Sequence, residues 1–153
     1  WKGLSLMKTK IHAAAGVISF LTILAFWTST VFSELFSSHE TIALVKAMIL
    51  KGMFVLIPAM AIVGASGMSM GRKRKDTAAI AKKKRMLVIA ANGILVLLPS
   101  AFFLEFKIAE GAFDSWFYAI QLLELTGGAA NLTMMGLNIR DGLTMTGRIG
   151  KKP

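Results

Sequence analysis

The sequence predicts an all-α integral membrane protein, in which four transmembrane helices form a bundle with both ends of the chain on the cytoplasmic side. Hydrophobic residues make up 55% of the 153 residues, and the mean hydropathy is +0.63, which is too apolar for an ordinary soluble domain. Charged residues amount to only 17% and lie between long apolar runs. A membrane helix needs about 20 mainly apolar residues, so four spans and their connections use the whole chain as one domain, residues 1–153.

The first span is expected over residues 11–36, after a head that carries three lysines. This apolar stretch is longer than the h-region of a signal peptide, and no small-residue cleavage site follows it, so we interpret it as a retained helix. The chain opens with Trp1 rather than methionine, and we therefore expect further residues to precede it.

The other three spans are expected over residues 41–70, 86–104 and 115–137. They are continuous apolar runs, unlike the alternating segments of about ten residues that form membrane β-barrels. Between the second and third spans the sequence predicts a basic cytoplasmic loop over residues 71–85. The fourth span is followed by a basic tail.

The distribution of charge predicts the orientation. The head, the middle loop and the tail hold fifteen of the 18 lysine and arginine residues, but only two of the eight acids. Lysine and arginine in short loops mark the cytoplasmic face, so both ends are expected inside, in a bacterial inner membrane. The loop is expected to bind anionic lipid headgroups or, alternatively, an acidic partner, but not nucleic acid. Its basic residues are Arg72, Lys73, Arg74, Lys75, Lys82, Lys83, Lys84 and Arg85.

Polar and small residues follow one face of the fourth span at spacings of three and four. They are Gln121, Glu124, Gly128, Asn131, Met135 and Asn138. Such a stripe is expected to face protein rather than lipid. The first span has a matching face: His12, Gly16, Ser19, Ile23, Phe26, Thr30 and Ser33. With Asn92 from the third span, these faces predict a bundle with a partly polar interior.

Lys51 and Glu124 are the charged residues expected deepest in the membrane. Each lies roughly 13–16 Å from the outer start of its helix, at a rise of 1.5 Å per residue. An unpaired charge at that depth costs several kcal/mol, so the two are predicted to pair. The pair could hold the packing together, serve a proton or ion pathway, or meet a partner subunit, a lipid or a cofactor.

His12 stands at the cytoplasmic mouth of the first span, one turn before Gly16. Histidine is a common ligand of b-type haem and of transition metals. The His-x-x-x-Gly pattern entering a membrane helix resembles the opening helix of several small membrane b-type cytochromes, which implies haem ligation by His12. Met70, Met86 and Met135 are expected at the same depth, and a His and Met set suits haem or Cu(I). A histidine and methionines that only pack the core are the alternative, with no cofactor bound.

Three functions follow from these features. The first is an accessory or scaffolding subunit of a larger membrane complex or homo-oligomer, because no catalytic motif is present and we do not expect an enzyme. The second is a membrane electron-transfer protein that binds b-type haem or another metal through His12. The third is a proton-coupled carrier built on Lys51 and Glu124. The absence of cysteine excludes thiolate metal sites and disulfides.

Overall fold

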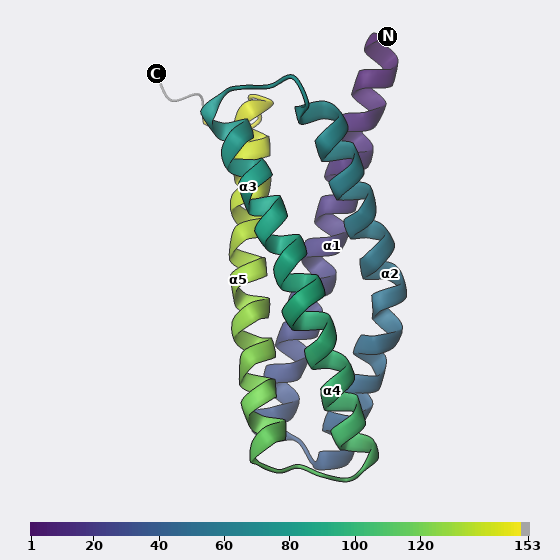
Figure 1. Cartoon of the computed structure of the whole chain (residues 1–153). Coiled ribbons are helices and arrows are strands. Elements are labelled where there is room, and N and C mark those ends of the chain that lie inside the picture. Colours follow the sequence, from purple (N-terminus) through teal and green to yellow (C-terminus); the bar gives the residue numbers. More distant parts are fainter. Residues whose placement is uncertain (151–153) are drawn as a thin grey trace.

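The computed structural model describes residues 1–150 as four long helices packed side by side (Figure 1). The first two are α1 (Lys2–Phe36) and α2 (His39–Gly71). The third combines α3 (Thr77–Asn92), the π-helical segment η1 (Gly93–Leu97) and α4 (Leu98–Ala109), and the fourth is α5 (Ser115–Met145). Successive helices run in opposite directions, so α1 begins and α5 ends at the same end of the bundle. The described residues contain no strand, and the all-α prediction is confirmed.

Short capped turns connect the helices. Side-chain oxygens of Ser38, Asp76 and Asp114 each accept a hydrogen bond from the backbone N–H three residues later, at 3.4, 3.4 and 3.0 Å. Each bond satisfies a donor at the start of a helix. The expected basic loop at 71–85 is therefore too long: only residues 72–76 lie between helices, because Asp76 caps a helix that begins at Thr77.

The third long helix contains one wider, π-helical turn at η1. There the N–H of Leu98 donates to the carbonyl of Gly93, five residues earlier. Pro99 follows directly, and it has no N–H to donate while its ring clashes with the carbonyl four residues before it. A wider turn at this point accommodates the proline without breaking the helix.

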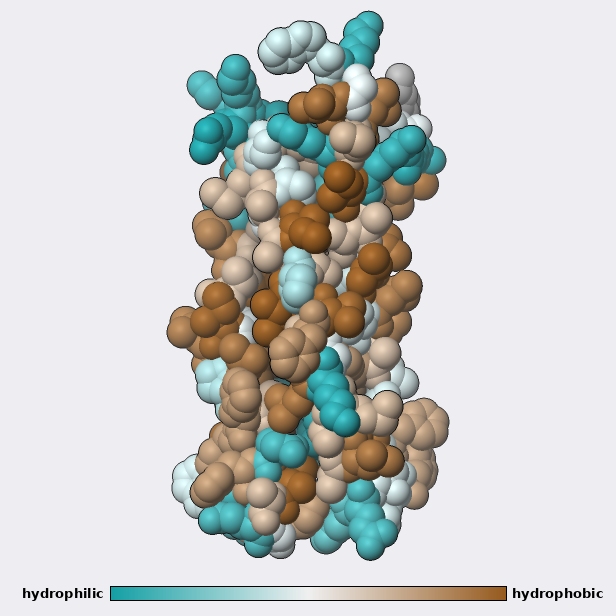
Figure 2. Space-filling model, turned by 90° about the vertical axis from the view of Figure 1, so that its right-hand side faces the viewer, coloured by the Kyte–Doolittle hydropathy of each residue, from teal (hydrophilic) through white to brown (hydrophobic). Residues whose placement is uncertain are grey.

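The bundle has an apolar outer surface and a partly polar interior. On the face shown in Figure 2, hydrophobic residues dominate the middle and hydrophilic residues gather at the two ends. Buried polar and charged side chains of the described residues are Ser19, Thr30, Ser33, Lys46, Ser100, Gln121, Asn131 and Asn138. A bundle that exposes apolar residues and buries polar ones is matched to an apolar surrounding.

Three of the four helices are long and apolar enough to cross a membrane: Lys2–Phe36, His39–Gly71 and Thr77–Ala109. Helix α5 is nearly as long, with 31 residues, but the polar stripe that it buries lowers its hydropathy. Gln121, Asn131 and Asn138 of this stripe are all buried against the other helices. The composition of α5 thus matches a helix that turns one polar side to protein.

Two apolar clusters hold the helices together. At the end formed by the 37–38 and 110–114 turns, Ile42, Leu104 and Phe117 pack with at most 2% exposure. Ile23, Ile89 and Met135 form the second cluster, further along the bundle. Towards the basic end, α2 and α3 diverge (Figure 1) and make few contacts with each other, whereas α1 packs closely on α2.

Candidate functional site

A buried ion pair joins α2 to α5. The Nζ atom of Lys46 lies 3.4 Å from both carboxylate oxygens of Glu124. Lys46 is only 3% exposed, and the Glu124 side chain is 15% exposed. Glu34 of α1 is close enough to interact electrostatically with both groups. The Lys46–Glu124 pair therefore lies within the partly polar interior with the Glu34 carboxylate near it, an arrangement that can hold the helices in one register or retain a proton.

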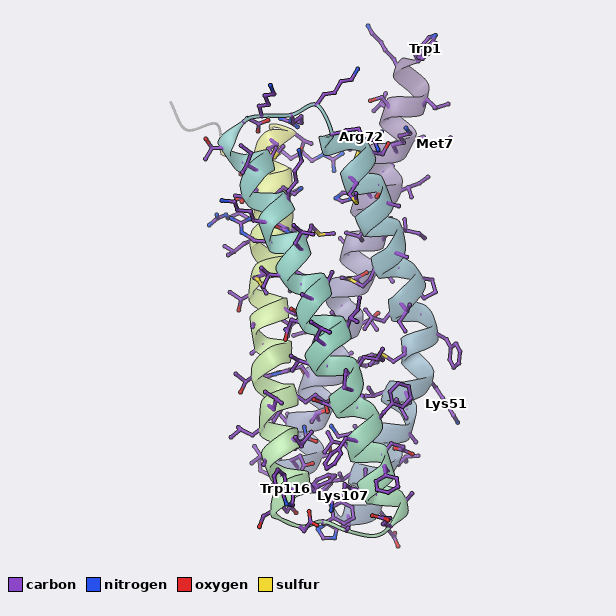
Figure 3. The ribbon with its side chains drawn as sticks, in the orientation of Figure 1. Trp1, Met7, Lys51, Arg72, Lys107 and Trp116 are labelled. Carbon is purple, nitrogen blue, oxygen red and sulfur yellow. The ribbon has the colours of Figure 1, made fainter. Side chains whose placement is uncertain are left out.

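The predicted pairing of Lys51 with Glu124 is wrong. Lys51 lies exposed on α2 and points away from the bundle (Figure 3). It follows Lys46 by five residues, which is about 140° around an α-helix, so the two lysines cannot share a face. Depth along the helix selected Lys51, but depth does not define which side faces inward. The carrier hypothesis loses the ion pair on which it was based.

A signal for Lys46 was nevertheless present in the sequence. Apolar residues share its inward face at spacings of three and four: Ile42, Ile49, Met53, Leu56, Met60 and Val63. Lys46 occupies the one position of this stripe that is not apolar. A charged residue inside an apolar helical stripe is expected to find a buried partner.

Asparagines connect α3 to α5. Asn92 Nδ2 donates to Asn131 Oδ1 at 2.8 Å and to the Gly127 carbonyl at 2.9 Å. Asn131 Nδ2 donates in turn to the Ile89 carbonyl at 3.4 Å. Gln121 lies on the same face at 3% exposure, and neither of its amide atoms has a hydrogen-bond partner among residues 1–150. The structure thus brings Asn92 and Asn131 together and leaves Gln121 buried nearer Glu124.

A second ion pair ties the basic end of α3 to α5. Arg85 Nη1 donates to Asp141 Oδ2 at 2.7 Å and to Asn138 Oδ1 at 3.0 Å. Asp141 also accepts a bond of 2.9 Å from Arg140. Arg85 was expected to contact lipid headgroups, but in the structure its guanidinium is directed to α5.

His12 lies between α1 and α2. Its Nδ1 is 2.9 Å from Ser66 Oγ, and that hydroxyl donates to the Ile62 carbonyl at 2.5 Å. In the tautomer that carries its proton on Nδ1, the ring donates to the Ser66 oxygen, and the second ring nitrogen, Nε2, has the lone pair. The ring packs on Gly67, where an added Cβ would approach His12 Cε1 to 3.2 Å. A neutral histidine oriented through Nδ1 is the form that ligates metals.

A cavity of about 1330 Å³ runs from the basic end of the bundle down to Glu124. His12, Met70, Met86 and Met135 all line it, so the structure brings the four predicted cofactor ligands to the wall of one space. Seven of the ten methionines line this cavity, which gives it an apolar and adaptable wall. No group of three or more histidine, aspartate and glutamate side chains within residues 1–150 is arranged to hold a metal ion.

Apart from Arg85, the predicted headgroup residues divide into two sets. Arg72, Arg74, Lys82 and Lys83 line the cavity at its basic end, and Figure 3 shows Arg72 at that end of α2. Lys73, Lys75 and Lys84 are exposed and do not line it. The positive charge of this end is therefore partly gathered around an opening rather than spread over a surface.

Comparisons with protein-family models, with curated proteins and with solved structures gave no match to this chain.

Proposed function

We propose that this chain is a small integral membrane protein that crosses the bilayer four times and acts as a non-catalytic accessory subunit of a larger membrane complex. The apolar outer surface supports a membrane location. The burial of the polar stripe of α5 supports a fourth span, because polar side chains inside a membrane face protein rather than lipid. The setting that we propose is a bacterial inner membrane.

The orientation that we propose places the basic end in the cytoplasm. The start of α1, the 72–76 turn and the end of α5 share this end of the bundle. Glu40, Glu110 and Asp114 lie at the opposite end. Because basic residues in short connections stay on the cytoplasmic side, both chain ends should be inside.

The absence of cysteine permits a clean test of this orientation. Single-cysteine variants Ser37→Cys and Lys75→Cys place one thiol in the turn at each end of the bundle. In intact cells an impermeant maleimide should label Ser37→Cys only, and Lys75→Cys should react after the membrane is opened. The reverse labelling pattern would refute the orientation.

The exposed position of Lys51 is the observation that best supports the subunit role. It is exposed among apolar neighbours on α2, including Met48, Phe54 and Val55, which are 62, 83 and 55% exposed. It lies about 18 Å from the start of α2 at His39, which is inside the expected hydrocarbon layer. A charge there is costly when it faces lipid, and it is satisfied by an acidic group of a neighbouring chain. The partner is another membrane subunit or a second copy of this chain.

A photo-crosslinking amino acid at position 51 tests this proposal in native membranes, with the same group at Leu122 as the control. Leu122 is 66% exposed on α5 and has apolar character, so it should face lipid. We expect one defined cross-linked species from position 51 and none from position 122. Lys51→Arg should keep the complex during native electrophoresis, whereas Lys51→Met should weaken it. A chain that migrates as a lone monomer in native lipid would refute the subunit role.

A b-type haem protein is the second candidate, and the geometry of His12 favours it. Ser66 lies 2.9 Å from Nδ1, and in the Nδ1–H tautomer Nε2 is free to ligate a metal; His12 lines a large cavity whose wall also contains methionines. A visible spectrum of the purified protein decides between the candidates. A Soret band that responds to dithionite and disappears in His12→Ala would support haem. A colourless preparation without bound metal would remove this candidate.

A further inference from the structure

The cavity combines an apolar wall with a basic mouth, and this combination fits an amphipathic anion. On α1 the lining extends from Thr9 to Thr30, which is about 30 Å along the helix. One leaflet of the hydrocarbon core is about 15 Å deep, so the space is long enough for an acyl chain. Its volume of about 1330 Å³ also exceeds the roughly 300–1,000 Å³ of pockets for small ligands.

We propose that this cavity binds an anionic phospholipid. An acyl chain of the lipid would lie in the methionine-rich interior, and its phosphate would lie at the basic mouth formed by Arg72, Lys82 and Lys83. The inference rests on the membrane location proposed above. This binding differs from the general attraction of a basic surface to lipid headgroups, because the bound lipid would lie between the helices.

The charges at the mouth support an anionic ligand. Arg72, Lys82 and Lys83 line it, and none of the three has a carboxylate within 4 Å among residues 1–150. Asp141, the acid nearest this end of α5, is occupied by Arg85 at 2.7 Å. Glu124 lies far down the cavity and is paired with Lys46. Basic pockets between membrane helices on the cytoplasmic side are suited to lipid phosphates.

The cavity also has a side entrance and space that glycines leave open. Residues that line it and are nevertheless exposed include Ile57 and Met68 of α2 and Leu87 and Ala90 of α3. An acyl chain can therefore enter sideways from the bilayer, where α2 and α3 make few contacts. An added Cβ at Gly64 would meet no atom within 4 Å, so this lining position marks unfilled space.

Trp27 provides a probe inside the cavity. It lines the space, and its Nε1 donates to the Leu125 carbonyl at 2.9 Å, which holds the ring in place. In a Trp1→Phe/Trp116→Phe background it is the single tryptophan. The protein is reconstituted in phosphatidylcholine vesicles that contain phosphatidylglycerol with brominated acyl chains. We expect brominated phosphatidylglycerol to quench Trp27 more strongly than brominated phosphatidylcholine at the same mole fraction. Equal quenching by the two lipids would overturn the proposal.

Matched charge variants separate a built site from a basic surface. Lys82→Gln/Lys83→Gln and Lys73→Gln/Lys75→Gln remove the same charge, but only the first pair lines the cavity. We expect the first pair to weaken phosphatidylglycerol binding roughly 30-fold, about fivefold for each lysine at an anionic group. The second pair should weaken it by less than about threefold. An equal loss in both would show surface attraction alone and refute the proposal.

Filling the cavity gives an independent test that does not change charge. Gly64→Leu should fold, since leucine is a better helix former than glycine and the space is open. Ala90→Leu and Ala91→Leu are a matched pair of exposed positions in α3, and only Ala90 lines the cavity. Quenching should fall by at least half in Gly64→Leu and Ala90→Leu and stay unchanged in Ala91→Leu. A reduction of the same size in Ala91→Leu would count against an internal lipid.

Two controls identify the source of any failure. Vesicle flotation in phosphatidylcholine alone reports membrane insertion, so a protein that inserts but shows no lipid selectivity refutes this inference and leaves the membrane proposal intact. Glycerophosphoglycerol carries the same phosphodiester without acyl chains, and we expect it not to compete. Full competition would assign the mouth to a soluble phosphate and overturn the phospholipid proposal.

Discussion

Replacing Glu124 with glutamine leaves the Lys46 ammonium buried beside a neutral amide, and we expect the free energy of unfolding to fall by about 3 kcal/mol. Removal of one partner from a buried pair generally costs about 3–5 kcal/mol, because the other charge is left uncompensated. Lys46 is 3% exposed, so water cannot replace both of its 3.4 Å contacts with Glu124. Because the Glu34 carboxylate also attracts this ammonium, we expect a loss of stability at the lower end of that range of about 3–5 kcal/mol.

A double-mutant cycle with Lys46→Met isolates the interaction. The double variant has no buried ion in this pair, so it should be more stable than the sum of the single changes predicts, by about 2 kcal/mol. The assay is reversible unfolding in mixed detergent micelles, followed by circular dichroism at constant pH. Lys51→Met is the control, because this exposed side chain should change the stability of the isolated chain by no more than about 0.5 kcal/mol.

Strict additivity of Lys46→Met and Glu124→Gln would refute the buried pair. A loss in Lys51→Met as large as in Lys46→Met would refute the assignment of the inward face of α2. Both outcomes can be measured without knowledge of the function, because the double-mutant cycle compares only free energies of unfolding.

Two further predictions concern contacts elsewhere in the bundle. Gly52→Ala places a Cβ against the Phe26 ring and should lower the free energy of unfolding by about 1–3 kcal/mol. Gly64→Ala places its Cβ in open space and should raise the free energy of unfolding by about 1 kcal/mol. Thermal melts of the two variants measure the difference. The Arg85 guanidinium holds the pKa of Asp141 below its ordinary value. The resulting stabilisation is present above the ordinary aspartate pKa and is lost as the pH falls through the folded-state pKa. Asp141→Asn should abolish that part of the acid destabilisation in melts taken from neutral to acid pH.

The faces of α1 and α5 were predictable from sequence because polar residues in an apolar helix have few places to lie. Ser19, Thr30 and Ser33 are buried on α1, as the stripe predicted. Gln121, Asn131 and Asn138 are buried on α5. A polar stripe within an apolar helix defines an angle around the helix axis, and the other helices must cover that angle.

The inward face of α2 was harder to predict because depth along the helix favoured Lys51 and left Lys46 nearer the outer end. An ion pair requires the two side chains to point at each other, which depends on the rotation of α2 against α5. The apolar stripe that contains Lys46 carried this information, but charge and depth alone did not. The length of the basic loop was missed for a local reason: Asp76 caps a helix, and a run of lysines is compatible with helix.

By itself the sequence determined the number of long helices, their apolar character and the concentration of basic residues at one end. These properties depend on local composition, because each helix satisfies its own backbone hydrogen bonds. Only the tertiary structure decided that Lys46 rather than Lys51 meets Glu124, and that His12, Met70, Met86 and Met135 line one cavity. Those outcomes depend on how far apart the helices stand and how each is turned about its axis, and packing between distant segments sets both.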